Sequence, residues 1–195
     1  MIKSGFTINN PITNSKTVVL QSDLETNGMG WLLEISTEPG AQPDINEHLH
    51  LDWTETFEIL SGAAHYKLNG VQKIAQAGEK FVVKPREHHI HPWNAGETQM
   101  VYRQSNQFAK QSPEAVQEVL GVFATIAGLA REGRVDTTGR PKNPLQLAAT
   151  MRVLIRHGGY DSSLSISAQN FLSASLGLFA EFLGYRGVYP KFLAE

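Results

Sequence analysis

The amino-acid sequence predicts a mainly β fold, a sandwich or barrel of short strands, followed by about three α-helices. Residues 1 to 106 alternate short runs rich in Val, Ile, Thr and aromatic residues with turn-forming residues, which is typical of small all-β domains. From Ser112 onward the apolar residues recur with helical spacing. We therefore expect a barrel over residues 1–106. A helical extension over residues 107–195 would pack on the barrel or at a dimer interface.

The expected strands follow one another at short, regular intervals. The clearest turn between them is Asn69-Gly70, because this pair accepts the positive φ values of a two-residue hairpin. Pro39-Gly40 and Ser61-Gly62 end two other runs. The predicted strand segments are residues 17–20, 30–35, 56–60, 64–68, 71–74, 80–83 and 99–102.

Three helices are expected in the C-terminal part. Ser112-Pro113 supplies an N-cap and a first-turn proline for the first, which Gly133 ends. Asn143-Pro144 opens the second, which ends at residues 157–159. The third covers about residues 165–183, and its apolar side chains point almost all round. Such a helix has to be covered by the barrel, by the other helices or by a second subunit, and we expect a homodimer.

Composition excludes several classes of protein. The chain has 195 residues, a net charge of −2 and no cysteine, so disulfides, thiolate metal sites and cysteine nucleophiles are ruled out. Because the chain has no excess of basic residues, we do not expect it to bind nucleic acid. No segment of 18 residues is free of polar groups and the N-terminus lacks the apolar run of a signal peptide. We therefore expect a cytoplasmic protein that does not contact the membrane. We expect its ligand to be a small molecule.

Two groups of histidines stand out in the predicted barrel. His48 and His50 form the first, and His88, His89 and His91 form the second. Residues two apart in a strand point to the same side, so each group can direct two imidazoles at one point. Neutral imidazole and carboxylate together are the usual ligands of divalent first-row metals. This pattern predicts a metal site.

The spacing around the first group resembles the first motif of the cupin superfamily. His48-x-His50 is followed by four residues, Glu55, six residues and Gly62, as that motif requires. The leading glycine is less regular, since Gly40 lies two residues further from His48 than in the family pattern.

A second cupin motif is recognisable from Gly78 to His89. The spacing between this glycine and the histidine agrees with the family pattern, while Lys84 and Arg86 stand where the family has proline and glycine. The family's asparagine is matched one position late, by Asn94. If the altered loop is displaced, His91 takes the ligand place of His89. The helical tail also resembles a group of bacterial single-barrel cupins with a C-terminal extension.

The resemblance implies a double-stranded β-helix barrel with a divalent metal held by His48, His50, Glu55 and His89. The metal could be Fe, Mn, Ni, Cu or Zn, because a mixed His/Glu site accepts each of them. The first functional hypothesis is a metal-dependent small-molecule enzyme, similar to dioxygenases or isomerases, whose catalytic residues are not assigned. The alternative is a non-catalytic barrel that binds or senses a small ligand. A storage function is disfavoured because storage cupins usually have two barrels.

Other residues are candidates for the walls of the binding pocket. His91 is two residues from His89, so its side chain should point to the same side of the strand. We consider three roles for it: an extra metal ligand, a group that hydrogen-bonds to a ligand, or an acid/base that lines the pocket. Trp53 and Trp93 flank the two motifs, and Tyr102 lies on the following strand. Core or dimer packing is an equal alternative for both tryptophans. Arg103 either faces inward, where it would bind a carboxylate, or forms an outward ion pair.

Overall fold

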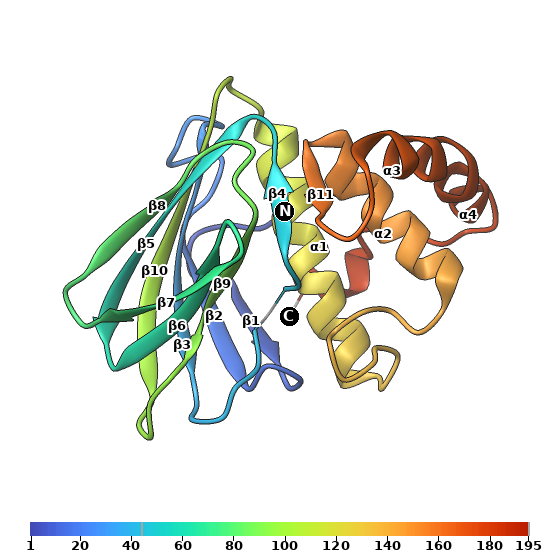
Figure 1. Ribbon diagram of the computed structural model, residues 1–195. Helices are drawn as coiled ribbons and strands as arrows, with labels where there is room; N and C mark the ends of the chain where they lie inside the picture. Colours follow the sequence, from blue (N-terminus) through green and yellow to red (C-terminus); the bar gives the residue numbers. More distant parts are fainter. Residues whose placement is uncertain (44, 195) are drawn as a thin grey trace.

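The computed structural model describes residues 1–43 and 45–194, and its β part consists of two antiparallel sheets (Figure 1). The first has the strand order β1-β2-β3-β10-β5-β8 and the second has the order β11-β4-β9-β6-β7. The strands are β1 Thr7–Asn10, β2 Ser15–Gln21, β3 Gly30–Thr37, β4 His48–His50, β5 Trp53–Ser61, β6 Ala63–Leu68, β7 Val71–Gln76, β8 Lys80–Val83, β9 His89–Asn94, β10 Met100–Phe108 and β11 Gly159–Asp161.

The C-terminal part is helical, which confirms the predicted fold class. Ser112 and Asn143 accept hydrogen bonds from first-turn N–H groups of the first two helices, as expected for N-caps. The third predicted helix is continuous but widens into a π-helical turn at its centre. The helical elements are α1 Pro113–Arg131, α2 Pro144–Arg156, α3 Ile166–Leu172, the π-turn η1 Ser173–Gly177, α4 Leu178–Phe182 and a short 3-10 turn η2 Pro190–Phe192.

The sequence did not predict β11, the strand between α2 and α3. It pairs with β4 over three residues, with Gly159 opposite His50 and Asp161 opposite His48. A three-residue strand such as β4 would otherwise expose unpaired backbone groups at a sheet edge. The helical extension therefore contributes a strand to the barrel and fixes the strand that contains the first two histidines.

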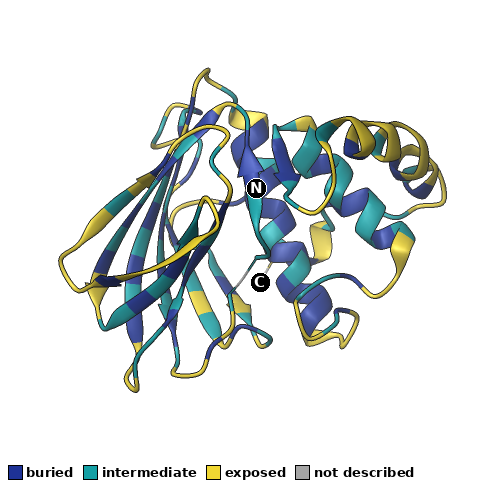
Figure 2. Ribbon diagram, in the orientation of Figure 1, coloured by how far each residue is buried: buried dark blue, intermediate teal, exposed yellow. Residues whose placement is uncertain are grey.

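The barrel interior is filled by aromatic and aliphatic side chains. Buried positions alternate with more exposed ones along the strands (Figure 2). Trp31 is 1% exposed and contacts Trp53, Phe108 and Phe123 edge-on, with ring centroids 5.7–6.2 Å apart. Since Phe123 belongs to α1, this cluster joins the barrel to the first helix. The barrel core and the buried face of α1 form one continuous hydrophobic core.

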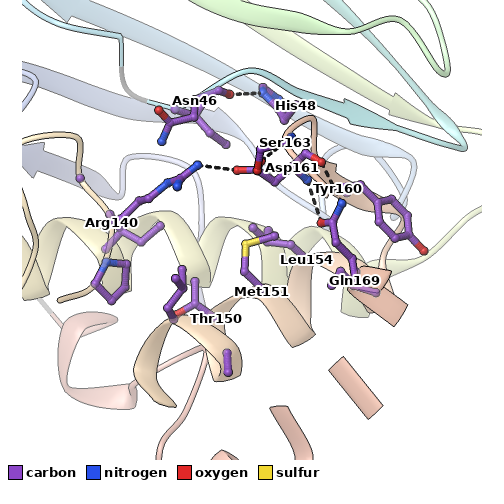
Figure 3. Close-up of a pocket in the computed structure, with 18 of the residues that line it drawn as sticks. Asn46, His48, Arg140, Thr150, Met151, Leu154, Tyr160, Asp161, Ser163 and Gln169 are labelled. Atoms are coloured by element: carbon purple, nitrogen blue, oxygen red, sulfur yellow. Dashed lines mark hydrogen bonds and ion pairs between the residues drawn. The ribbon is translucent and has the colours of Figure 1, made fainter. Parts of the chain in front are cut away.

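A cavity of about 340 Å³ lies between the barrel and the helices (Figure 3). Its walls come from β3, β4, β5, β9, β11, α1, α2 and the α3–η1 segment. Such a volume is within the range of small-molecule sites. Among the described residues, no helix is long and apolar enough to span a membrane.

Candidate metal centre

Four imidazoles lie together on one sheet of the barrel. His48 and His50 project from β4 and His89 and His91 from β9, and His48 pairs with His89 across the two strands. The ring centroid of His48 lies 4.1 Å from that of His89 and 4.9 Å from that of His91. The centroid of His50 lies 4.7 Å from that of His89. The alternation of side chains along both strands thus brings the two histidine groups together, as the sequence predicted.

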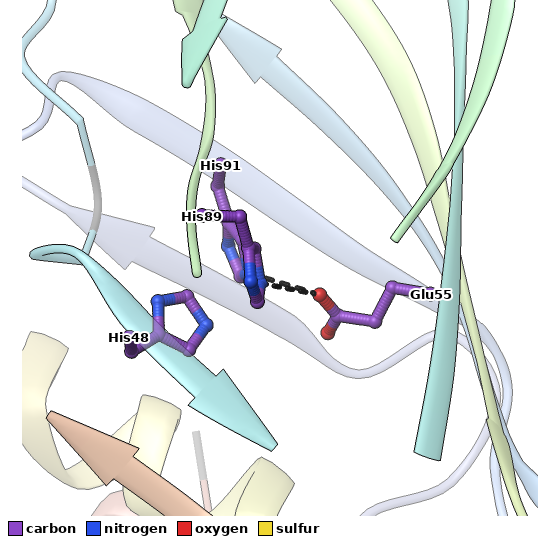
Figure 4. A group of neighbouring side chains, drawn as sticks. All are labelled: His48, Glu55, His89 and His91. Atoms are coloured by element: carbon purple, nitrogen blue, oxygen red, sulfur yellow. Dashed lines mark hydrogen bonds and ion pairs between the residues drawn. The ribbon is translucent and has the colours of Figure 1, made fainter. Parts of the chain in front are cut away.

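Glu55 reaches this cluster from the opposite sheet. Its Oε2 lies 3.2 Å from Nε2 of His50, 3.1 Å from Nε2 of His89 and 3.3 Å from Nε2 of His91. Figure 4 shows His89 and His91 directed at this carboxylate, with His48 beside them. The carboxylate and three of the imidazoles are almost completely buried. One ligand atom from each of His48, Glu55, His89 and His91 falls within 4.8 Å of the others.

Gln104 orients the carboxylate. Its Nε2 donates a 2.9 Å hydrogen bond to Oε1 of Glu55, which leaves Oε2 to face the histidines. Gln104 lies on β10, opposite Phe57 of β5, and is 2% exposed. Gln104 was not predicted as a site residue, although it lies two residues after Tyr102 on the same strand, and the alternation of side chains therefore directs it to the same inward side.

Backbone carbonyls set the orientation of three imidazoles. Nδ1 of His48 lies 2.9 Å from the Asn46 carbonyl, Nδ1 of His50 lies 3.2 Å from that of Trp53, and Nδ1 of His89 lies 3.0 Å from that of Glu87. A carbonyl only accepts hydrogen bonds, so each Nδ1 carries the proton. The lone pair of a neutral ring is then on Nε2, which is the usual tautomer of metal-bound histidine.

This proton distribution favours a cation within the cluster. A neutral His50 or His89 has one N–H, yet each ring meets a carbonyl on one side and the Glu55 carboxylate on the other. A metal between Nε2 and Oε2 removes the conflict between the two lone pairs. Two atoms bound about 2.1 Å from one metal at 90–110° lie roughly 3.0–3.4 Å apart, and the observed separations are 3.1–3.3 Å. The donor set therefore fits a divalent metal.

The pKa values of the cluster agree with neutral imidazoles beside an ionised carboxylate. Burial lowers the pKa of His48 well below its usual value, and the neighbouring histidines lower it further. Burial also lowers the pKa of His50, although Glu55 opposes the shift. For Glu55, burial raises the pKa, but the positive charge that His50 and His91 carry when protonated, and the hydrogen bonds that protonated His50 and His89 donate, outweigh it, so the net pKa is well below the usual value. All three groups are in the protonation state that binds metal.

We expect the metal-free protein to lose stability as the pH falls below 6.5, the ordinary pKa of histidine. Buried His48 stays neutral in the folded state while the unfolded chain takes up a proton, so protons favour unfolding. The free energy of unfolding should fall by about 1 kcal/mol between pH 6.5 and 5.5 for each histidine that stays neutral in the folded state, because the unfolded histidine is only half protonated at pH 6.5. Urea unfolding in EDTA at pH 7.0 and 5.5 measures this loss. The loss should shrink in a His48→Gln variant, and equal stability at both pH values would contradict the expectation.

The unusual loop before His89 keeps its place in the barrel. Arg86 adopts φ 72°, the left-handed conformation for which the family has glycine. Its backbone N–H donates a 2.7 Å hydrogen bond to the His50 carbonyl. Glu87 closes the loop by accepting a 2.8 Å hydrogen bond from the Lys84 N–H. The altered turn therefore links the second motif to the first, and His89 and His91 both reach the cluster.

A β-bulge explains why the asparagine of the second motif comes one residue late. Along β6 the register advances from His65 to Lys67, while the paired residues on β9 advance from Trp93 to Ile90, so β9 contains one extra residue. Asn94 consequently faces inward, is 6% exposed and donates a 3.0 Å hydrogen bond to the Thr37 carbonyl.

The same bulge turns Trp93 away from the cavity. Its ring lies 5.6 Å from that of His65, its partner on the neighbouring strand, and it is absent from the described residues that line the cavity. Tyr102 is likewise absent from that lining. It is 1% exposed and packs in the barrel core near Phe57, at a centroid distance of 6.3 Å. The expectation that these two side chains form cavity walls is therefore corrected.

The other predicted wall residues do meet the cavity. Trp53 and His91 line it, together with His48 and Glu55. Trp53 is also part of the aromatic core, so its two predicted roles coincide. Arg103 faces outward, with an ion pair of 3.2 Å to Glu34. The histidine–glutamate cluster thus opens directly into the cavity under the helices.

Comparison with known proteins agrees with the fold and the motifs. Residues 34–102 match the family model of the cupin domain. The chain contains a cupin domain. This match spans both histidine groups and Glu55, and with the clustered side chains it indicates a metal site. No curated protein shows significant sequence similarity to the chain.

Several solved structures are similar to part of this chain. A predicted oxalate decarboxylase from Thermotoga maritima is 20% identical with a TM-score of 0.45, over 48% of this chain and 80% of that one. A Klebsiella pneumoniae protein with a double-stranded β-helix domain is 18% identical with a TM-score of 0.42, over 57% and 85%. A putative sugar phosphate isomerase from Acidithiobacillus ferrooxidans is 23% identical with a TM-score of 0.42, over 50% and 62%. These similarities concern the fold alone.

Proposed function

We propose that this cupin is a metal-dependent enzyme acting on a small molecule. His48, His50, Glu55 and His89 would hold one divalent transition metal. The observation that supports this most strongly is the meeting of the buried Nε2 atoms of His50, His89 and His91 at a single carboxylate oxygen, 3.1–3.3 Å away. His48 joins this group, since one of its ligand atoms lies within 4.8 Å of those of Glu55, His89 and His91. His91 would stand beside these ligands without holding the metal, where the cluster meets the cavity.

In the proposed reaction, the metal, the His91–Glu55 pair and Gln104 would have separate roles. A bound metal supplies Lewis-acid polarisation of substrate oxygens or redox chemistry with O₂. His91 lines the cavity and lies 3.3 Å from Glu55, so this pair is placed to take a proton from a bound substrate and return it. Gln104 keeps the Glu55 carboxylate in place through Oε1. Dioxygenation or isomerisation of an oxygen-bearing substrate fits these roles.

Metal analysis tests the proposal. We expect about one transition metal per chain in untagged wild-type protein by inductively coupled plasma mass spectrometry. A His48→Ala, His89→Ala double variant should lose it, because two of the four ligands are removed. His88→Ala is the matched control, since His88 adjoins His89 but is exposed and its Nδ1 contacts Ser162 Oγ at 2.7 Å.

The result also separates the enzyme from a ligand-binding module. Metal that is lost only in the double variant supports the enzyme and justifies measuring oxygen consumption. Protein without metal after reconstitution with Fe(II), Mn(II), Ni(II), Cu(II) or Zn(II) would contradict the proposal and favour a metal-free binding or sensing barrel.

We also propose that the chain forms a homodimer through the α3–η1–α4 helix. Its outer face exposes large apolar side chains, and two of them, Phe171 at 71% and Phe182 at 83%, are the most accessible. Its one charged residue, Glu181, pairs with Arg152 at 2.9 Å. An uncharged apolar face is compatible with a second copy of itself, as a two-fold interface requires. The cytoplasmic location and the lack of nucleic-acid and membrane partners stay predictions.

We expect a Phe171→Ser, Phe182→Ser double variant to be monomeric under conditions where the wild type is dimeric. Light scattering coupled to size-exclusion chromatography measures the mass of each. Val71→Ser is the control, because Val71 is also exposed but belongs to β7 of the barrel. A monomeric wild type, or a double variant that stays dimeric, would refute this interface.

A further inference from the structure

The cavity beneath the helices combines a polar end with apolar walls. The polar end is the histidine–glutamate cluster, of which His48, Glu55 and His91 line the cavity. The opposite wall consists of side chains from the helical extension, which are mainly aliphatic or aromatic: Val119, Phe123, Ile126, Leu147, Met151, Leu154, Ile155, Leu172 and Leu176. Figure 3 shows Met151 and Leu154 of this wall. A ligand at the cluster would therefore extend away from it along a mainly apolar wall.

Charged groups in the cavity wall do not favour a highly charged ligand. Among the described lining residues outside the cluster, the charged side chains are Arg140 and Asp161. They pair with each other at 2.7 Å, so the guanidinium is already neutralised. A phosphate group or a second carboxylate would lose its hydration in this cavity without gaining a free cation.

Unsatisfied polar atoms lie near the cluster. The indole N–H groups of Trp31 and Trp53 are buried and have no hydrogen-bond partner within residues 1–43 and 45–194, and both side chains line the cavity. The amide of Asn106 is also unpartnered among these residues, and Asn106 is 5% exposed. It pairs with Glu55 on one neighbouring strand and with Trp31 on the other. Buried polar groups are normally satisfied, and ligand oxygens at this end would supply acceptors for the two indole N–H groups that line the cavity.

We infer that the cavity binds a ligand with an oxygen-bearing head, of at most one negative charge, at the histidine–glutamate cluster and an apolar body against the helices. An apolar cavity of about 150 Å³ holds one benzene molecule, so a cavity of this size would accommodate roughly a dozen non-hydrogen atoms. Binding of the ligand's head at the cluster rests on the proposed function. Binding of its apolar body against the helices does not depend on the metal. The helical extension sets the substrate class because it leaves no free cation for a second charged group, such as a phosphate, on the body of the ligand.

Binding of two hydroxamates tests the inference. Acetohydroxamate and octanohydroxamate present the same metal-binding head and differ by six methylene groups. Each methylene moved from water into an apolar site tightens binding about fourfold at most. For zinc-loaded protein, isothermal titration calorimetry should show octanohydroxamate binding at least about 100-fold more tightly. Equal affinities would overturn the inference.

A variant with a filled cavity locates the apolar body. Ala148 of α2 lines the cavity, so Ala148→Trp should abolish the preference for octanohydroxamate and leave acetohydroxamate affinity unchanged. Ala77→Trp, in the exposed turn between β7 and β8, is the matched control. If Ala148→Trp does not fold, Met151→Ser removes apolar wall without adding bulk and should reduce the preference about tenfold. A preference that persists in the cavity variant would overturn the inference.

Titration of metal-free protein with 1-octanol separates this inference from the proposed function. We expect 1-octanol to bind metal-free wild-type and Ala77→Trp protein but not Ala148→Trp protein. Octanol binding by a protein that takes up no metal would refute the metal-dependent enzyme and retain the apolar site. Metal uptake with no octanol binding and equal hydroxamate affinities would retain the enzyme and refute the apolar site.

Discussion

Replacing Glu55 by Gln is expected to lower the affinity for divalent metal at least about 100-fold while the barrel stays folded. Loss of an outer-shell partner alone typically costs 10–100-fold in metal affinity, and Glu55 is the one carboxylate in the described cluster. Gln has the same shape but no negative charge. In the metal-free state its amide N–H can donate to an imidazole Nε2, so we expect the metal-free variant to be at least as stable as the wild type.

Thermal unfolding with and without metal checks both parts of this prediction. Metal that binds only the folded state raises the melting temperature of the wild type, and this rise should vanish in Glu55→Gln at the same metal concentration. Glu58→Gln is the matched control, because Glu58 lies on the same strand but forms an outward ion pair of 3.1 Å with Lys80. Wild-type metal affinity in Glu55→Gln would remove the carboxylate from the ligand set.

Much of the fold followed from local patterns in the sequence. Asn69-Gly70 marked the hairpin between β6 and β7, and Ser112-Pro113 and Asn143-Pro144 marked the starts of α1 and α2. These signals depend on backbone conformation and caps within a few residues, so they are readable without tertiary contacts. The histidine cluster was predictable for the same reason, since strand alternation alone directs His48 with His50 and His89 with His91.

Features that depend on contacts between distant segments were not predictable. The bulge in β9 reverses the expected direction of Trp93, and its presence shows only in the register against β6. β11 is three residues long and forms because β4 offers it an edge. The cavity likewise arises where α2 and η1 pack over the barrel. In the sequence, the apolar residues of its wall cannot be distinguished from residues that pack in a helical core. Identical side-chain patterns serve packing and ligand binding, and only tertiary structure separates them.

Gly30→Ala is expected to destabilise the protein by more than about 3 kcal/mol, or to prevent folding. Gly30 begins β3, where the strand approaches β10 so closely that an added Cβ would lie 1.8 Å from the Asn106 carbonyl oxygen. The obstructing atom belongs to the backbone, so it cannot be relieved by a change of rotamer. Its φ of 155° adds further strain for an L-residue with a side chain.

The damage should extend to the metal cluster, because the displaced strands also position its surroundings. Trp31 follows Gly30 directly, and Asn106 of β10 pairs with Trp31 and with Glu55. Gly96→Ala is the matched control, since the nearest atom to its added Cβ would be 3.6 Å away, an ordinary contact. Urea unfolding followed by circular dichroism compares the two variants with the wild type. Wild-type stability of Gly30→Ala would show that β3 and β10 do not approach this closely in solution, and the placement of Glu55 beside the histidines would then lose part of its structural basis.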